Sequence, residues 1–147
     1  MRPLADCDLR LEALQDSPDA FWTRLADALE RGEEHWRAAA APPCHVADDS
    51  GRLVGMVSAF PDDDDRALTH LIAMYVSPGA RRRGLGGALL EAQLAWARAA
   101  GYERVALMVN TANTGAVALY ERLGFRESGR RGRMHGRVLI AEMTCEL

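Results

Sequence analysis

Three arginines and three glycines form the part of this 147-residue sequence with the clearest chemical use. Arg81 to Arg83 carry fixed positive charge, and Gly84, Gly86 and Gly87 follow them without side chains that would keep a ligand off the backbone. Apolar residues then recur every three or four positions as far as Gly101, which indicates a helix. Because the first turn of a helix has unbonded N–H groups and partial positive charge, the pattern predicts a site for a diphosphate.

A strand leads into this loop. Residues 71–76 are apolar and Ser77-Pro78-Gly79 ends them. Other phosphate-binding loops have the same order of strand, loop and helix, but a P-loop requires G-x-x-x-x-G-K-[ST] and a dinucleotide fold requires G-x-G-x-x-G. Neither pattern is present here.

The loop resembles motif A of the GCN5-related N-acetyltransferases (GNAT), whose signature is Q/R-x-x-G-x-G/A after a V-x-P strand end. Val76-Ser77-Pro78 supplies the strand end, and Arg81, Gly84 and Gly86 match the signature in order and spacing. Downstream, N-x-x-A-x-x-L-Y-x-x-x-G-F looks like motif B of the same family. Its residues are Asn113, Ala116, Leu119, Tyr120, Gly124 and Phe125. The resemblance covers residues 46–147.

The resemblance implies an α/β (α+β) GNAT fold, with a mixed, mostly antiparallel central sheet flanked by helices, as a single N-acetyltransferase domain over residues 1–147. It also implies direct transfer of the acetyl group of acetyl-CoA to a primary amine in a ternary complex, without a metal. The acceptor, a small molecule or a peptide or protein amine, is left open, as is a homodimer. The alternative function is a non-catalytic acyl-CoA-binding sensor or interaction module.

In the family, the strands that here carry Met74 to Val76 and Val105 to Val109 splay apart, and the pantetheine arm of coenzyme A pairs with the first of them. The expected acetyl-CoA-binding residues are Met74, Tyr75, Val76, Arg81, Arg82, Arg83, Gly84, Gly86, Gly87, Asn113 and Ala116. Simpler alternatives are a solvated loop for the arginines and a helix cap for Asn113.

Tyr120 is the candidate general acid. The departing thiol has a pKa of about 8.5, so a nearby phenol with a pKa of about 10 can donate a hydrogen bond or proton as negative charge develops on sulfur. The alternative is a core tyrosine, because Ala116, Leu119 and Leu123 share its helix stripe.

The general base is the point of departure from related subfamilies. Ribosomal-protein acetyltransferases of this fold carry a strand glutamate where this chain has Met108, and a thioether cannot accept the amine proton. We rank His70 first as a replacement, although a lone strand histidine is more often structural. The other candidates are Glu33, Glu34, His45, His135 and a chain of waters.

The family places helices over the acceptor side, so Phe21, Trp22 and Trp36 either line an acceptor pocket or, as the simpler alternative, pack in the core. The acidic run from Asp62 to Asp65 either attracts a cationic amine or forms a solvated turn.

Elements are expected as follows. A helix capped by Asp6 or Asp8 runs to Leu14, and Ser17-Pro18 starts a second helix with Ala20, Phe21, Leu25, Ala28 and Leu29 on one face. Only residues 1–4 remain for the family's first strand, which is therefore short or missing. Strands follow at 44–47, 52–60, 71–76, 104–109, 125–128 and 138–147. In the last strand, Leu139, Ala141, Met143, Cys145 and Leu147 are expected on one buried face. Asn110 or Thr111 is expected to cap the motif B helix.

Composition sets broader limits. The chain is 48% hydrophobic and 27% charged with a net charge of -3, which gives no general attraction to nucleic acid or anionic membranes. Arg130, Arg131 and Arg133 lack interleaved aromatic residues, so no nucleic-acid partner is expected. Cys7, Cys44 and Cys145 are widely spaced and are expected to be free thiols. With no apolar run near 18 residues and no export signal, we expect a cytoplasmic protein without a membrane contact.

Overall fold

The computed structural model describes residues 3–21, 23–32, 34 and 43–147. In chain order the elements are α1 (Pro3–Asp16), the short 3-10 helix η1 (Pro18–Ala20), α2 (Leu25–Leu29), β1 (His45–Asp49), β2 (Arg52–Pro61), β3 (Leu68–Val76), the 3-10 turn η2 (Pro78–Ala80), α4 (Leu85–Ala99), β4 (Arg104–Asn110), α5 (Thr114–Arg122), β5 (Arg126–Met134) and β6 (Val138–Glu146). The expected mixed α/β fold is confirmed.

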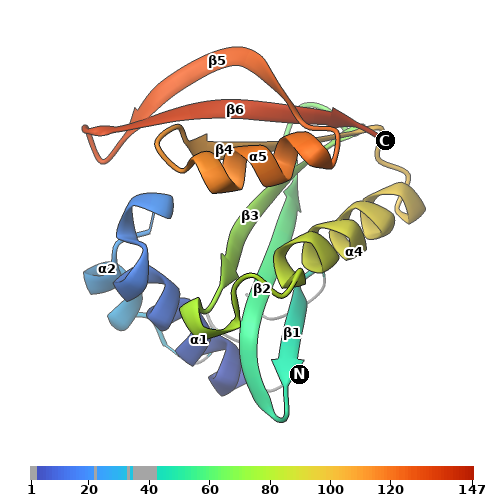
Figure 1. Ribbon diagram of the computed structural model, residues 1–147. Coiled ribbons are helices and arrows are strands. Elements are labelled where there is room, and N and C mark those ends of the chain that lie inside the picture. The colour runs from blue at the N-terminus through green and yellow to red at the C-terminus, as the bar shows by residue number, and fades with distance from the viewer. Residues whose placement is uncertain (1–2, 22, 33, 35–42) are drawn as a thin grey trace.

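One six-stranded sheet, in the order β1-β2-β3-β4-β6-β5, carries the helices (Figure 1). All neighbouring strands are antiparallel except β3 and β4, which are parallel. No strand precedes α1 in the described part of the chain.

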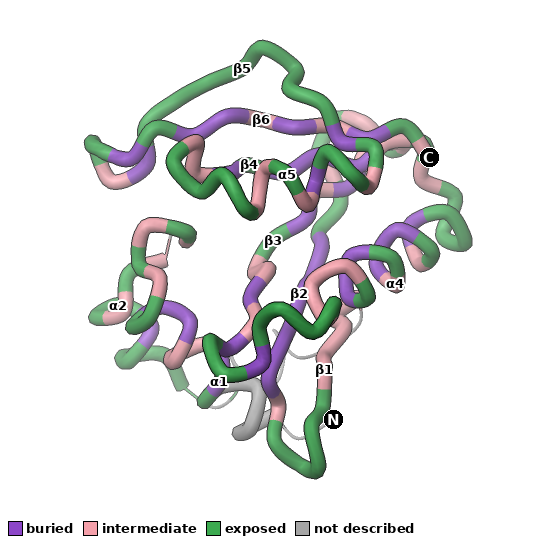
Figure 2. The backbone as a smooth tube through the Cα atoms, in the orientation of Figure 1, coloured by how far each residue is buried: buried purple, intermediate pink, exposed green. Residues whose placement is uncertain are grey.

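The two faces of the sheet are covered by different helices. Val57 belongs to the main core with Leu90 of α4 and Tyr120 of α5, whereas the adjacent Met56 packs with Leu9 of α1. Consecutive strand residues point to opposite faces, so α1 lies on the face opposite α4 and α5. Burial is concentrated in β2, β3, β4 and β6, while β5 is exposed along most of its length (Figure 2).

The prediction of one helix from Ser17 through Leu29 was wrong. The chain forms η1 and α2 as separate short helices, with extended backbone at Phe21 and Arg24 between them. Tertiary contacts explain the break, because the Phe21 ring meets Tyr75 edge-on at 6.4 Å and its carbonyl accepts a hydrogen bond from His135. The first helix is also longer than predicted, since α1 spans Pro3–Asp16.

Three predictions in the C-terminal half were also wrong. The motif B helix is capped by Asn113, whose Oδ1 accepts the Ala116 N–H at 3.1 Å, because Asn110 is used to close the preceding turn through the Ala112 N–H. Leu139 is 51% exposed, while Ile140 packs with Met134 and Val138 on the other face. Strand β5 extends well beyond the predicted end at residue 128, because β6 pairs with it despite its lack of an apolar pattern.

Candidate active site

The sheet divides between β3 and β4. These strands pair only where Leu68 to His70 face Arg104 to Ala106, and they then diverge (Figure 1). The divergence begins just before a bulge in β3, where Ala73 has a φ of 56° and the register against β2 shifts. Among the described strands, none pairs with the β4-facing edge of β3 from Leu71 to Val76. This edge therefore offers backbone groups to an extended ligand.

The loop after β3 leads into the N-terminus of α4. Arg82 has a φ of 65° and Gly84, the residue before the helix, a φ of 77°; no side chain caps this helix end. Left-handed residues in such a loop turn successive N–H groups toward a common point, which is typical of anion sites. The uncapped first turn of a 15-residue helix adds donors and partial positive charge.

The three arginines differ in their contacts. Arg81 donates to the Val76 carbonyl at 2.9 Å and to Asp16 at 2.8 Å, and Arg83 contacts Asp49 at 3.3 Å. These two side chains thus fix the loop to β3, α1 and β1. All three are exposed, and Arg82 makes no such contact with the described residues. Cofactor binding by the arginines remains a prediction.

The glycines serve two purposes. A Cβ at Gly86 would lie 3.2 Å from Leu119 of α5, so this glycine permits the close approach of α4 and α5. A Cβ at Gly87 would meet no atom within 4 Å, so its small size leaves space beside the helix end. The α4–α5 contact therefore depends on Gly86, while Gly87 keeps the first turn open.

Tyr120 lies in the core but carries a hydroxyl without a partner. Its residue is 8% exposed, and its ring meets Phe125 edge-on at 5.8 Å. No described residue bonds to this hydroxyl, and burial raises the pKa of Tyr120 to about 12. Buried hydroxyls are usually hydrogen-bonded, so one without a partner suits a group that meets a ligand.

The other expected cofactor residues are positioned by their backbone. Met74 and Val76 pack partly buried against the main core, and Tyr75 points to α1 on the other face. The Tyr75 hydroxyl donates to Glu12 at 3.0 Å, and burial raises the pKa of Tyr75 above its usual value. Ala116 lies in the first turn of α5, where its N–H is bonded by Asn113. For Asn113 the capping alternative is therefore observed, and contact with the cofactor arm stays a prediction.

His70 lies in the last residue pair between β3 and β4, at the closed end of the gap where these two strands diverge; we call this gap the opening. Its Nε2 is 2.7 Å from Oδ1 of Asp62, and its ring stacks on Phe60 at 5.0 Å. The hydrogen bond from His70 is the main reason that the pKa of Asp62 is lowered. The remaining acidic run forms a turn, in which Asp65 accepts the Ala67 N–H and pairs with Arg104.

Among the other candidate bases, the two histidines form hydrogen bonds away from the gap between β3 and β4. His45 lies on the outer strand β1 and bonds to Gln93 of α4 at 2.6 Å. Both ring nitrogens of His135 are occupied, by Arg24 and by the Phe21 carbonyl. Glu34 is exposed. Glu33, Trp22 and Trp36 lie outside the described residues, as does the side chain of Cys7; Cys44 and Cys145 are free thiols.

A carboxylate that sequence reasoning missed lies beside Met108. Met108 is 42% exposed on the face opposite α5, and Glu142 of β6 pairs directly with it across the sheet. The Glu142 side chain is 13% exposed and bonds to Ser128 at 2.7 Å and Arg130 at 3.3 Å, two residues in the β5 bulge. Its alternation with buried Met143 and Ala141 was visible in the sequence, but its pairing with Met108 depends on strand order.

Comparison with known proteins decides the family. A model of the acetyltransferase (GNAT) family matches residues 9–125. The chain belongs to the GNAT family. This confirms the family expected from the two motifs.

Relatives of this GNAT chain include the mycothiol acetyltransferase of Salinispora tropica, 38% identical over 131 residues, with coverage of 84% of the chain and 42% of the relative. N-acetyltransferase 8 of Homo sapiens is 35% identical over 103 residues, with coverage of 68% of the chain and 41% of the relative. The chain therefore spans less than half the length of these curated relatives.

Solved structures agree with the fold of this GNAT chain. The ribosomal-protein-alanine N-acetyltransferase of Brucella melitensis superposes with a TM-score of 0.81 at 26% identity, covering 99% of the chain and 94% of that structure. An acetyltransferase of Salmonella typhimurium with its cofactor acetyl-CoA superposes with a TM-score of 0.80 at 22% identity, covering 100% and 91%. At 22% identity, the similarity to the Salmonella typhimurium structure supports the fold alone.

Proposed function

We propose that the chain is an acetyl-CoA-dependent N-acetyltransferase that transfers the acetyl group directly to a primary amine. The observation that carries this proposal is the buried Tyr120 hydroxyl, which has no partner among the described residues. The hydroxyl of a core tyrosine is normally hydrogen-bonded to the protein, whereas the hydroxyl of a general acid must stay available for the reacting sulfur.

Acetyl-CoA would supply the thioester and the leaving thiol. The uncapped α4 N-terminus and Arg82 would hold its diphosphate, and the free edge of β3 would pair with its extended arm. Tyr120 would donate its proton toward the departing sulfur, since its raised pKa keeps it protonated at neutral pH. The acceptor amine would approach from the face that exposes Met108.

A steady-state assay of free coenzyme A thiol, with acetyl-CoA and a panel of amines, tests this function. Release that depends on both the amine and the protein is expected. The assay needs an amine-free control, because Cys44 and Cys145 are free thiols and Cys44 is only half-buried. A rise in melting temperature with acetyl-CoA, but no amine-dependent release with any of the panel, would instead indicate an acyl-CoA-binding module.

A further inference from the structure

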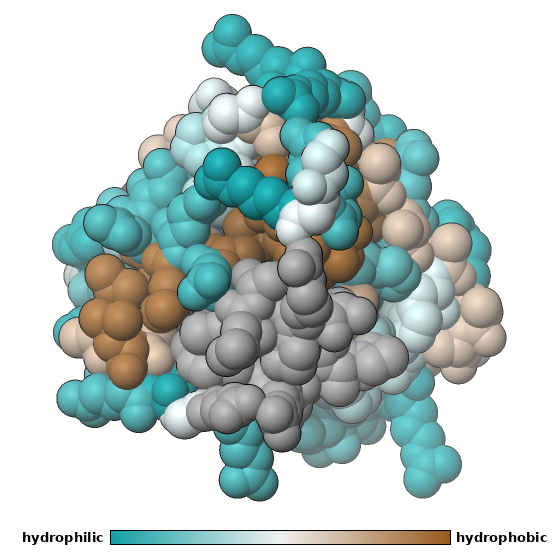
Figure 3. All heavy atoms as spheres, turned by 90° about the horizontal axis from the view of Figure 1, so that it is seen from below, coloured by the Kyte–Doolittle hydropathy of each residue, from teal (hydrophilic) through white to brown (hydrophobic). Residues whose placement is uncertain are grey.

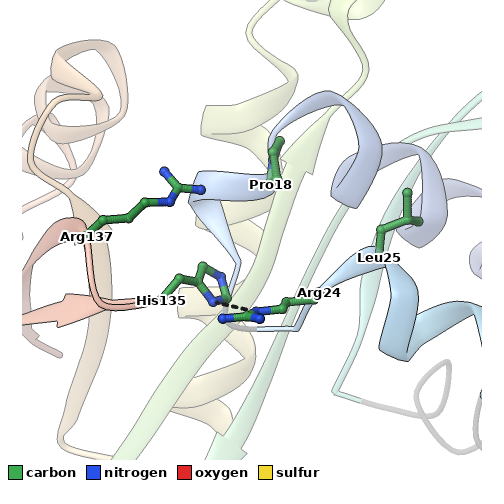
Figure 4. Close-up of a pocket in the computed structure, with 5 residues that line it drawn as sticks. All are labelled: Pro18, Arg24, Leu25, His135 and Arg137. Carbon is green, nitrogen blue, oxygen red and sulfur yellow. Dashed lines mark hydrogen bonds between the residues drawn. The ribbon is translucent and has the colours of Figure 1, made fainter.

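A pocket of about 340 Å³ lies between the β5–β6 turn and the segment that joins η1 to α2. It is lined by Pro18, Arg24, Leu25, His135 and Arg137 (Figure 4). Three of these five residues carry nitrogen donors, and none is acidic. The loop that binds diphosphate in our proposal contributes no residue to it.

The pocket is assembled by contacts between distant parts of the chain. His135, at a φ of 52°, directs Nε2 to the Phe21 carbonyl at 2.7 Å. The Nε of Arg24 donates to the other ring nitrogen of His135 at 3.4 Å (Figure 4). The two ring nitrogens of His135 therefore hold the Phe21 carbonyl and the Arg24 guanidinium in place, and an imidazole brings no negative charge to offset that of Arg24.

The two arginines leave a net positive charge. Arg24 pairs with no carboxylate among the described residues. Arg137 pairs with Asp19 at 2.7 Å, but both side chains are largely exposed, and such surface pairs are weak enough to be exchanged for another anion. A planar guanidinium binds carboxylate or phosphate through two parallel hydrogen bonds, which makes this pocket suitable for an oxyanion.

The pocket adjoins the acceptor side of the opening. One of its walls, η1, contacts β4, the strand that exposes Met108. Along β6, Val138 at the pocket end is four residues from Glu142, which pairs with Met108. At about 3.3 Å per residue, this separation is about 13 Å. The surface of the molecule over α2 carries both apolar and hydrophilic residues, with the apolar ones gathered at the left of the view from below (Figure 3).

We infer that this pocket binds an oxyanion, a carboxylate or a phosphate, on the amine acceptor. This inference rests on the proposed N-acetyltransferase function, which it narrows to acidic acceptors. The strand distance of about 13 Å from Val138 beside the pocket to Glu142 beside Met108 favours an acceptor with several bonds between amine and anion, for example a short peptide with a free C-terminus, since an extended chain spans about 3.3–3.6 Å per residue.

The first test compares matched acceptors. Values of kcat/KM are measured for di-, tri- and tetraglycine as free acids and as C-terminal amides, and for aminoalkyl phosphates against the corresponding amino alcohols. The wild-type protein is expected to prefer the charged member of a pair by about 10- to 100-fold, the range for a hydrogen bond to a charged group. Preference within the peptide pairs indicates a carboxylate, and preference within the phosphate pairs a phosphate. Equal rates within all pairs would overturn the inference.

Substitutions locate the effect. Arg24→Gln is expected to reduce the acid-to-amide ratio to about 1 while the KM for acetyl-CoA stays unchanged, and Arg24→Lys should restore part of the ratio. Arg122→Gln removes the same charge from the end of α5 and is the matched control. An unchanged ratio in Arg24→Gln would contradict the assignment of this pocket.

A binding measurement separates failure of the inference from failure of the proposed function. Titration of the coenzyme A-loaded protein with triglycine, triglycine amide and an aminoalkyl phosphate is expected to show tighter binding of the anions, lost in Arg24→Gln. Such binding without turnover would keep the pocket and refute the enzyme. Turnover of neutral amines without preferential binding of either anion would support the proposed enzyme and refute the anion pocket.

Discussion

At the scale of single residues, the reaction depends most on Tyr120. Its neighbours are apolar, and the raised pKa results from burial alone, so the phenol is protonated over the whole range in which the protein would work. A protonated phenol stabilises the thiolate only as charge develops, and therefore acts on the rate more than on binding.

We expect Tyr120→Phe to lower kcat by about 10²- to 10⁴-fold, the usual contribution of a general acid, with little change in acetyl-CoA binding. Thiol-release kinetics and thermal shift with acetyl-CoA measure the two effects. Tyr102→Phe is the control, because Tyr102 packs against Trp96 at the end of α4 and lacks a role in the proposed site. A similar loss in both variants would assign Tyr120 to packing.

The acceptor proton poses the second residue-scale question. A lysine-like amine with a pKa near 10.4 must lose its proton before attack, at a free-energy cost of about 4.6 kcal/mol at pH 7. Met108 cannot accept it. His70 is oriented by Asp62, and Glu142 is held by Ser128 and Arg130.

We expect the alkaline rise of kcat/KM to follow the pKa of the acceptor, as in deprotonation through water. The measurement uses two acceptors whose pKa values differ by about two units, in wild type, His70→Gln and Glu142→Gln. A rise at the same pH for both acceptors, abolished in one variant, would instead identify that residue as the general base.

At the scale of elements, the N-terminus of α4 is the decisive feature. Its first turn is uncapped, and Gly87 lies there with open space around its Cα. A longer side chain at this position can therefore enter the proposed diphosphate site without disturbing the packing that Gly86 maintains with Leu119.

We expect Gly87→Glu to abolish the rise in melting temperature caused by acetyl-CoA, because its carboxylate would repel and displace the diphosphate. Gly87→Gln has almost the same shape without the charge and should retain a larger share of the shift. Each free protein should melt near the wild-type temperature or above, since glycine disfavours helix. Full binding by Gly87→Glu would place the diphosphate elsewhere.

At the scale of the whole molecule, partly exposed aspartates connect separate elements. Asp16 at the end of α1 bonds to Arg81, Asp19 near η1 bonds to Arg137, and Asp65 before β3 bonds to Arg104 of β4. The pKa of each is lowered, by the hydrogen bond from Ser17 and then Arg81 for Asp16, from Arg137 for Asp19, and from the Ala67 N–H and then Arg104 for Asp65.

Because of these aspartates, we expect the melting temperature to depend little on pH near neutrality and to decrease once the pH is lowered below about 4. A carboxyl whose folded pKa is depressed contributes stability above its unfolded value of about 3.9, and this contribution is lost as pH falls through the lower folded value. Thermal unfolding from pH 7 to pH 2 measures it. Asp19→Asn should weaken the acid dependence, whereas Asp63→Asn, for which no partner is seen among the described residues, should leave it unchanged.

No helix in the described ranges is long and apolar enough to cross a membrane. The helices pack on the central sheet, with α4 and α5 on one face and α1 on the other. The β5–β6 turn contacts the N-terminal segment from η1 to α2, because His135 bonds to the Phe21 carbonyl and Arg137 bonds to Asp19.

The sequence by itself determined the features that depend on local chemistry. Gly84 marks the loop, because its φ of 77° just before α4 is a left-handed conformation that glycine adopts without strain, and it places no side chain over the backbone donors. The position of Tyr120 on the motif B helix was predictable from the sequence, and its role as general acid stays a prediction. The limits of α4 and β4 followed closely from apolar periodicity.

Only the tertiary structure decided which distant residues meet. The partnership of Glu142 with Met108 depends on β6 lying beside β4, and the pocket at Arg24 depends on His135 meeting Phe21 across more than a hundred residues. The break at Phe21 and the full length of β5 were missed for the same reason. Local propensities differ by a few tenths to about 1 kcal/mol per residue, so packing and hydrogen bonds between distant segments readily override them.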